Sequence, residues 1–254
     1  MKTYICDNVL VPLRCAPSHK SEMESQMLFG EKYVITDKIL NWSKIALLND
    51  NCEGWIDTNH QIPLEFNFNG KPSTINKSLV CHKDDNTTMV LVPGSEIYSP
   101  DYITNSFYIN NIKYNAEPSF NESWTVPSGT PADTALGFIN APYLWGGKSY
   151  LGIDCSGLTQ LVCKIHGVHL PRNGSKQVLH GKEVSFLGEA RKGDLLFFDN
   201  PKGEISHVGL LVDTGLIIHA SGRVRIDAVD HQGIFRKEFG RYSHKLRIIK
   251  RMFD

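Results

Sequence analysis

The sequence has no excess of charge of either sign, because 27 Lys and Arg residues balance 27 Asp and Glu residues in its 254 positions. A chain without net charge has no general field that attracts a polyanion, so we expect no nucleic-acid partner. It also lacks any run of the ~18 apolar residues that a membrane span requires, so we expect no membrane partner. Hydrophobic residues still make up 41% of the chain, which predicts a globular protein with a sizeable core.

The first residues lack the apolar core of a secretory signal peptide, because Asp7, Pro12 and Arg14 interrupt the only apolar stretch there. If Met1 is the native start we expect a cytoplasmic protein, and otherwise one exported to the cell envelope. The cytoplasm keeps cysteines reduced, and the six cysteines form no Cys-x-x-Cys pair. We therefore expect free thiols and no structural zinc site.

The first half of the chain has the pattern of small β-barrels. Short β-branched and aromatic runs alternate with Asn, Asp, Gly and Pro up to about residue 125. A polar stretch from Gln61 to Ser78 divides this half, and the segment Glu117 to Ala135 has the composition of a linker. We therefore expect one all-β barrel over 1–63, and a second barrel with its linker over 64–125.

The second half has a different pattern, with helices followed by apolar strands. Helical patterns cover residues 132–141 and 154–167, and apolar strands are predicted at 193–199, 207–213 and 216–222. Residues 126–254 are therefore expected to form an α+β domain in which helices pack on an antiparallel sheet.

Cys155 lies at the predicted start of the second helix, directly after Asp154. The apolar residues behind it have the spacing of one buried helical face, and they are Leu158, Leu161, Val162 and Ile165. Unpaired N–H groups and the helix dipole favour a thiolate at such a position, so Cys155 is a candidate nucleophile. Cys163 lies in the middle of the same helix and is expected to be structural.

Two histidines provide the other groups that a nucleophilic cysteine needs. His207 and His219 lie in neighbouring predicted strands, which a turn at Asp213-Thr214-Gly215 would bring together. Their residue types suit a base and the group that orients it. The other eight histidines, His244 among them, lie in loops or polar contexts and carry no predicted role.

Five motifs in the second half resemble the NlpC family of papain-like cell-wall cysteine peptidases. In chain order they are Tyr143-Leu144-Trp145-Gly146-Gly147, Gly152-Ile153-Asp154-Cys155-Ser156-Gly157-Leu158, Gly193-Asp194-Leu195-Leu196-Phe197-Phe198, His207-Val208-Gly209 and Ile218-His219-Ala220-Ser221-Gly222. The resemblance implies that Cys155 attacks an amide carbonyl, His207 transfers the proton and His219 orients His207. It implies that N–H groups at the helix start and Tyr143 hold the oxyanion, and that no metal or other cofactor is needed.

The first half resembles the SH3-like barrel of the subgroup that cleaves γ-D-glutamyl-diamino acid bonds. The matching segments are Val11-Pro12-Leu13-Arg14, Ser21-Glu22-Met23, Leu28-Phe29-Gly30-Glu31 and Gly54-Trp55-Ile56. The resemblance implies that Glu22, or less closely Glu24, binds the free amine of the substrate's L-Ala. The second barrel resembles its counterpart less closely, which leaves open a role only as a spacer.

The same resemblance gives Asp154 and Ser156 contacts with the peptide's amino end and its D-glutamyl part. Helix capping by Asp154 and a first-turn role for Ser156 are an equally simple interpretation, and the two roles are compatible. Where the subgroup commonly has Pro-Arg-Asp-Ser, this chain has Pro171-Arg172-Asn173-Gly174-Ser175. The expected serine contact is therefore displaced or lost.

The sequence-based hypothesis is a monomeric cysteine endopeptidase that cleaves free L-Ala-γ-D-Glu-diamino acid muropeptides during cell-wall recycling. One alternative is a non-catalytic module that binds cell-wall fragments, because SH3-like barrels also bind such ligands. Another is a different amidase or acyl-transfer reaction at the same cysteine. The sequence does not distinguish diaminopimelate from Lys at the third position of the substrate.

Overall fold

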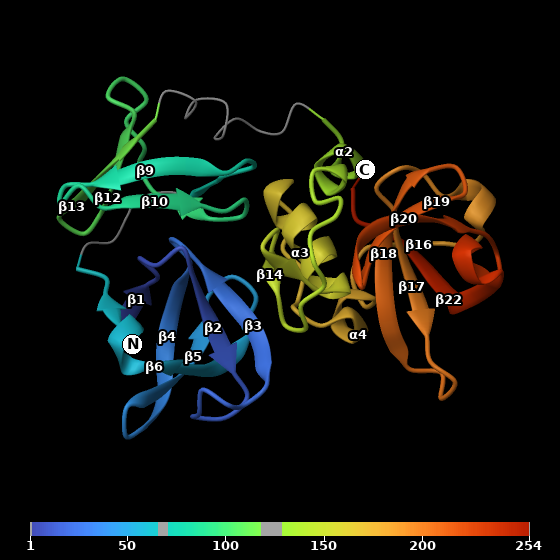
Figure 1. Cartoon of the computed structure of the whole chain (residues 1–254), viewed down its shortest axis with the longest axis horizontal. Coiled ribbons are helices and arrows are strands. Elements are labelled where there is room, and N and C mark those ends of the chain that lie inside the picture. Colours follow the sequence, from blue (N-terminus) through green and yellow to red (C-terminus); the bar gives the residue numbers. More distant parts are fainter. Residues whose placement is uncertain (1, 66–70, 118–128, 254) are drawn as a thin grey trace. The chain divides into compact units, whose positions relative to one another are not determined.

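The computed structural model describes residues 2–65, 71–117 and 129–253. It divides into two compact units, Met1–Val126 and Pro127–Asp254 (Figure 1). Most of the segment predicted as a linker, residues 118–128, lies outside the described residues. Within the described ranges, no helix combines the length and the apolar character that crossing a membrane requires.

The first unit begins with a seven-stranded antiparallel sheet in the order β3-β2-β6-β5-β4-β1-β7. Its strands are β1 (Thr3–Ile5), β2 (Leu10–Arg14), β3 (Met23–Leu28), β4 (Lys32–Ile39), β5 (Trp42–Leu47), β6 (Glu53–Asp57) and β7 (Ile62–Pro63). Alternation along β2 and β5 buries Val11, Leu13 and Ile45 in a shared core. The short helix η1 (Thr58–His60) leads into β7, which pairs with β1.

The same unit contains a four-stranded sheet in the order β10-β9-β13-β12 and a two-stranded sheet of β8 and β11. These strands are β8 (Ser73–Thr74), β9 (Leu79–Lys83), β10 (Thr88–Leu91), β11 (Glu96–Ile97), β12 (Ser106–Ile109) and β13 (Ile112–Ala116). Phe29, from the first sheet's part of the chain, is buried in this second core against Phe107 and Tyr114.

Gly30 lies at a close contact between the seven-stranded sheet and the second part of the first unit. Its φ is +82°, and an added Cβ would lie 1.9 Å from the carbonyl oxygen of Glu96. The Glu96 N–H donates a 2.8 Å hydrogen bond to the Phe29 carbonyl at the same place. Only glycine allows both the left-handed backbone and this close approach.

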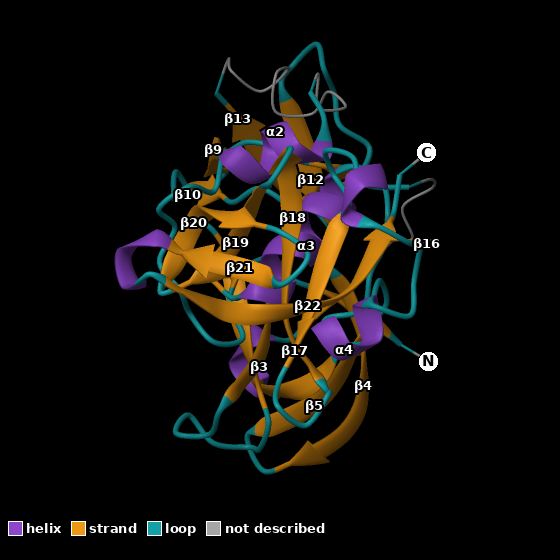
Figure 2. Cartoon of the chain, turned by 90° about the vertical axis from the view of Figure 1, so that its right-hand side faces the viewer, coloured by secondary structure: helices purple, strands orange, loops and turns teal. Residues whose placement is uncertain are grey.

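The second unit is built on a seven-stranded antiparallel sheet in the order β16-β22-β17-β18-β19-β20-β21 (Figure 2). The strands are β16 (Lys182–Val184), β17 (Leu195–Asp199), β18 (Ile205–Asp213), β19 (Leu216–Ser221), β20 (Arg223–Val229), β21 (Gly233–Arg236) and β22 (Arg241–Arg251). Because β22 pairs with β21 as well as with β17, strands β17 to β22 close into a ring. Leu196, Phe198, Ile217 and Ile249 belong to one buried cluster of this sheet.

Three α-helices pack against this sheet through β18: α2 (Pro131–Leu136), α3 (Cys155–Ile165) and α4 (Gly174–Gln177). A short hairpin of β14 (Lys148–Ser149) and β15 (Gly152–Ile153) precedes α3, and the short helices η2 (Leu187–Glu189) and η3 (Lys237–Phe239) connect strands. The predicted fold class is confirmed: all-β sheets precede an α+β unit. None of the five sequence motifs extends into strands β20 to β22. Helix α2 is shorter than the pattern over 132–141 predicts.

Candidate active site

Cys155 is the first residue of α3, as its spacing from the apolar face predicts. Asp154 is the N-cap, and its Oδ1 accepts a 2.7 Å hydrogen bond from the Gly157 N–H. This bond satisfies one of the unpaired donors of the first turn and fixes where the helix begins. Cys155 is partly exposed, whereas Cys163 in the same helix is buried.

The environment of Cys155 favours the thiol over the thiolate. Burial and the charge of Asp154 raise the pKa of Cys155 to about 11, against the opposing effects of backbone hydrogen bonds at Val208 and Ser156 and of Arg172. The helix start alone was expected to favour the thiolate, and that expectation is wrong because burial and Asp154 have the larger effect. A base must therefore take the proton when Cys155 attacks.

A chain of hydrogen bonds joins two histidines and a carboxylate on the neighbouring strands. His207 Nε2 lies 2.8 Å from His219 Nδ1, and His219 Nε2 lies 2.9 Å from Asp227 Oδ2. All three residues are buried. The backbone at Val208 lies within hydrogen-bond reach of the Cys155 thiol. Because Val208 follows His207 directly, the His207 end of the hydrogen-bonded series lies next to the nucleophile.

The pairing of β18 with β19 explains why the two rings meet. Gly209 is the register partner of His219, and His207 lies two residues before it on the same face of β18. A Cβ on Gly209 would lie 2.9 Å from the Cβ of His219 and 2.8 Å from the Ile218 carbonyl oxygen. Glycine at this position leaves the space that the His219 side chain occupies.

Both histidines are held in the neutral form. Burial, followed by the nearby His244 and His219, lowers the pKa of His207 well below 6.5. Burial also lowers the pKa of His219, although the hydrogen bond and the charge of Asp227 act in the opposite direction. A neutral His207 can accept a proton from Cys155, and Asp227 stabilises the proton on the histidine pair.

Asp227 was not identified from the sequence. Arg225 donates to its Oδ1 at 2.8 Å, and the Nε of Arg236 lies 3.7 Å from its Oδ2. Glu238 accepts from both arginines at 2.7 Å. The alternation of β20 against β19 was the only available signal, and it requires knowing that β20 pairs next to His219.

His244, which carries no predicted role, lies against the base in the structure. It lies in β22, and its ring stacks on His207 with ring centroids 4.1 Å apart and an interplanar angle of 23°. Ser243 Oγ lies 2.8 Å from its Nδ1, and burial lowers the pKa of His244 to about 4. No local sequence pattern indicates this contact, because closure of the ring by β22 brings the two residues together.

Arg172 binds the two residues that flank Cys155 in the sequence, Asp154 and Ser156. Its guanidinium donates to both oxygens of Asp154, at 3.0 Å and 2.5 Å, and to Ser156 Oγ at 2.9 Å. The Gly146 N–H donates to the same Asp154 carboxylate at 2.8 Å. All of Asp154, Ser156 and Arg172 are buried, so capping and charge pairing account for the first two, and their contact with substrate stays a prediction.

Tyr143 lies beside the nucleophile, at the β-bridge that pairs it with Ile153. Burial, and after it the charges of Cys155 and Asp154, raises the pKa of Tyr143 to about 12. Its phenol therefore stays protonated and can donate a hydrogen bond. The role of Tyr143 at the oxyanion stays a prediction.

Glu22 and Glu24 belong to the first unit. Glu22 is exposed just before β3, and its carbonyl accepts a 3.0 Å bond from the Cys15 N–H. Glu24 lies within β3, with its Oε2 3.4 Å from Cys15 Sγ. The exposed Glu22 carboxylate is available to a ligand, and its pairing with an amine stays a prediction.

The catalytic arrangement combines a thiol at a helix start with a buried histidine pair. It suits acyl transfer, in which a cysteine attacks a carbonyl and a histidine moves the proton from the thiol to the leaving amine. The first turn of α3 also offers backbone N–H groups, which can stabilise a developing oxyanion.

Known proteins with related sequences share both parts of the chain. Residues 140–242 match the NlpC/P60 family, and residues 13–60 match the bacterial dipeptidyl-peptidase SH3 domain. A Bacillus subtilis protein named gamma-D-glutamyl-L-lysine dipeptidyl-peptidase is 29% identical over 78% of this chain and 72% of its own length. A Bacillus cereus protein of the same name is 26% identical over 80% of this chain and 68% of its own.

The fold is also shared. The crystal structure of an NlpC/P60 family protein from Bacillus cereus matches 98% of this chain and 99% of its own, with a TM-score of 0.81 at 20% identity. An NlpC/P60 endopeptidase from Photobacterium damselae matches 97% of this chain and 70% of its own, with a TM-score of 0.67 at 18% identity. Residues 140–242 therefore form an NlpC/P60 cysteine peptidase domain, and residues 13–60 form a bacterial dipeptidyl-peptidase SH3 domain that precedes it.

Proposed function

We propose that this peptidase hydrolyses the bond between γ-D-glutamate and a diamino acid in free L-Ala-γ-D-Glu-diamino acid peptides. The observation that carries the reaction is the 2.8 Å contact between His207 and His219 beside the Cys155 thiol. The names of the two Bacillus relatives support the bond that is cleaved.

The reaction proceeds in two balanced steps. Cys155 Sγ bonds to the γ-carbonyl carbon while its proton passes to His207, and the C–N bond breaks as His207 protonates the leaving amine. Water then attacks the thioester, His207 accepts its proton, and the glutamyl carboxylate leaves as Sγ is reprotonated. His219 and Asp227 hold His207 in the orientation that both steps need.

The proposal also includes a requirement for a free amine on the L-Ala of the substrate. On this proposal the ammonium pairs with the exposed Glu22 carboxylate, and an N-acylated peptide loses that pair. The substrates are then peptides released from the cell wall, and the reaction serves their recycling in the cytoplasm.

The experiment is mass spectrometry of products from L-Ala-γ-D-Glu-L-Lys and from its N-acetylated form. We expect L-Ala-D-Glu and Lys from the free peptide only, and no product with Cys155→Ala. Cys163→Ala, in the same helix, is the matched control and should retain activity. Glu22→Gln should reduce the preference for the free peptide, whereas Glu24→Gln should have a smaller effect.

Cleavage by Cys155→Ala would contradict the assigned nucleophile. Equal cleavage of free and acetylated peptides by the unmodified protein would contradict selection of the free amine.

A further inference from the structure

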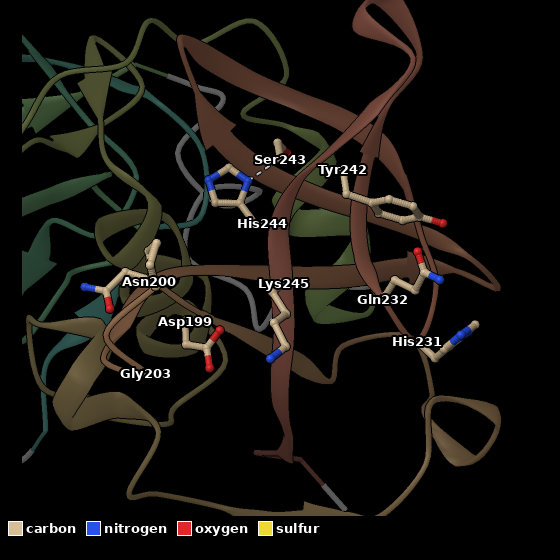
Figure 3. A pocket seen from close by; sticks show the side chains of 10 residues that line it. Asp199, Asn200, Gly203, His231, Gln232, Tyr242, Ser243, His244 and Lys245 are labelled. Carbon is tan, nitrogen blue, oxygen red and sulfur yellow. Dashed lines mark hydrogen bonds between the residues drawn. The ribbon is translucent and has the colours of Figure 1, made fainter.

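His244 covers one face of the base. Its ring stacks on that of His207 with ring centroids 4.1 Å apart, and Ser243 Oγ lies 2.8 Å from its Nδ1. His207 is 7% exposed, whereas His244 is half-buried and lines a pocket of about 780 Å³ (Figure 3). Neither His207 nor Cys155 is among the described residues that line this pocket. The His244 ring therefore lies between the base and the pocket.

The pairing of β22 with β21 turns His244 inward. His244 is the register partner of Ile234, which belongs to the buried cluster of the sheet. Leu246, two residues farther along β22, packs on the same cluster. A register shift makes Tyr242 the partner of Phe235, the residue after Ile234, so Tyr242 faces the opposite side of the sheet.

The hydrogen bonds of His207 determine which of its nitrogens acts as the base. Although burial has the opposite effect, hydrogen bonds from His219 and Arg225 lower the pKa of Asp227, so its carboxylate is ionised. An ionised carboxylate accepts the proton of His219 Nε2, so His219 Nδ1 accepts that of His207 Nε2. The nitrogen left to take the proton of Cys155 is therefore His207 Nδ1.

The direction in which Nδ1 points depends on rotation about the Cβ–Cγ bond of His207. This torsion has broad energy wells in histidine, and one hydrogen bond at the edge of the ring restrains it only weakly. A ring stacked at an interplanar angle of 23° restrains it more strongly, because rotation of His207 would drive its edge into His244. The stack therefore holds the plane in which the base meets the thiol.

The same contact contributes to the burial of His207. Burial, followed by the nearby His244 and His219, lowers the pKa of His207 well below 6.5. In the part of the chain that the structure describes, the side chains placed around it are Cys155 from α3, Phe198 from β17, His219 from β19 and His244 from β22. Removal of the His244 ring would open His207 to the pocket and relieve the largest cause of its low pKa.

His244 is itself uncharged while the reaction proceeds. Burial, followed by His219 and by Arg236 of β21, lowers the pKa of His244 to about 4, against the opposing charge of Asp227 of β20. A neutral ring can lie against His207 when His207 carries the proton of the thiol, whereas a charged ring would repel it.

We propose that His244 is a positioning residue of the peptidase, whose ring holds the ring plane of His207 and separates this base from the pocket. The inference rests on His207 as the base of the proposed reaction, whichever peptide is cleaved.

His244→Thr removes the ring and keeps a residue that favours strands. We expect kcat/KM for L-Ala-γ-D-Glu-L-Lys to fall about tenfold at about pH 7.5, as for other residues that orient a functional histidine. The pKa of His207 should rise toward 6.5, so protonation of the base adds about a further tenfold loss at about pH 5.5. The loss should therefore grow to about a hundredfold as the pH falls.

His244→Phe restores a flat ring without a titratable group. Because burial is the largest cause of the low pKa of His207, we expect this variant to recover kcat/KM to within about threefold at both pH values. Tyr242→Thr is the matched control, since Tyr242 lines the same pocket from the same strand but faces away from His207. It should leave kcat/KM unchanged.

An NMR titration of His207 tests the same inference without a substrate. The pKa of His207 should rise in His244→Thr and should stay low in His244→Phe and in Tyr242→Thr. An unchanged titration of His207 in His244→Thr, an equal loss of kcat/KM at both pH values, or no recovery in His244→Phe would overturn the role of His244.

Circular dichroism of the variants checks that the effect is local. Loss of the fold in His244→Thr would assign His244 to the architecture of the sheet and would also overturn the proposal. If the unmodified protein does not cleave the peptide, the proposed function fails, and the titration of His207 still decides the role of His244.

Discussion

The two sides of the active site bury their carboxylates in different surroundings. On the helix side, Asp154 caps α3 and is paired with Arg172, and both are almost fully buried. On the strand side, Asp227 pairs with His219 and with Arg225, whose side chain is 20% exposed. Asp154 raises the pKa of the nucleophile, whereas Asp227 raises that of the histidine next to the base. Asp154 therefore stabilises the start of α3 but disfavours the thiolate of Cys155, whereas Asp227 favours proton transfer to the histidine pair.

The largest expected effect comes from breaking the helix side. Arg172→Met leaves the Asp154 carboxylate buried without its cation, which should lower the free energy of unfolding by about 3–5 kcal/mol. Arg225→Met should lower it by only about 1 kcal/mol, because Arg236 remains near Asp227 and Arg225 is partly solvated. Denaturant unfolding measures both variants, and equal losses would remove the contrast between the two sides.

Gly209→Ala breaks the geometry of the strand side without removing any of its functional groups. The added methyl group would force the His219 side chain to move, since it would lie only 2.9 Å from the Cβ of His219. A displacement of this kind should reduce kcat/KM by about a hundredfold. Retention of the circular dichroism spectrum shows that the loss is local, and unchanged activity would show that the strand tolerates the methyl.

The pH dependence separates the two sides through their opposite pKa shifts. Because the pKa of His207 is lowered, its neutral form persists as the pH falls through 6.5, and kcat/KM should decline only below that value. Because the pKa of Cys155 is raised to about 11, alkylation of the free enzyme should keep rising by about tenfold per pH unit up to that range. An alkylation rate that levels off near pH 7 would indicate a thiolate at rest.

Asp227→Asn removes the charge behind the histidine pair and leaves a side chain of the same shape. We expect kcat/KM to fall about tenfold, as for other residues that orient a functional histidine. The pKa of His219, followed by NMR, should fall further because Asp227 raises it. Asp213→Asn is the control for loss of a carboxylate from this sheet, and a purely structural Asp227 would leave the His219 titration unchanged.

The smallest expected effect is a gain on the helix side. A Cβ at Gly174 would lie 3.7 Å from Val208 Cγ1 and 3.8 Å from Ser156 Cβ, so Gly174→Ser fits without strain. It places a hydroxyl where the family resemblance implies a serine contact, and we expect KM to fall by about threefold. An unchanged KM would mean that the contact is supplied elsewhere or is not used.

Much of the catalytic arrangement could be predicted from local sequence. The start of α3 follows from Asp154 and from the apolar face behind Cys155, and the pairing of β18 with β19 follows from their turn. Patterns of this kind involve residues that are close together in the chain, so they can be recognised in a single sequence.

The residues that were missed depend on pairing between distant strands. Asp227 acts through the register of β20, and His244 acts because β22 returns to both β17 and β21. The raised pKa of Cys155 was also outside the reach of the sequence, because burial depends on the whole fold. Contacts between distant parts of the chain therefore determine the pKa values of the site residues, whereas local sequence patterns identify the catalytic cysteine and the two histidines.

The ring closed by β22 has a consequence for biosynthesis. The strand that seals the sheet also carries the imidazole that lies on His207, so the base obtains its final surroundings only when the last strand of the unit has been made. A nascent chain ending before residue 241 already holds Cys155, His207 and His219 but lacks their enclosure. Peptidase activity should therefore appear only after β22 has been made and has closed the ring.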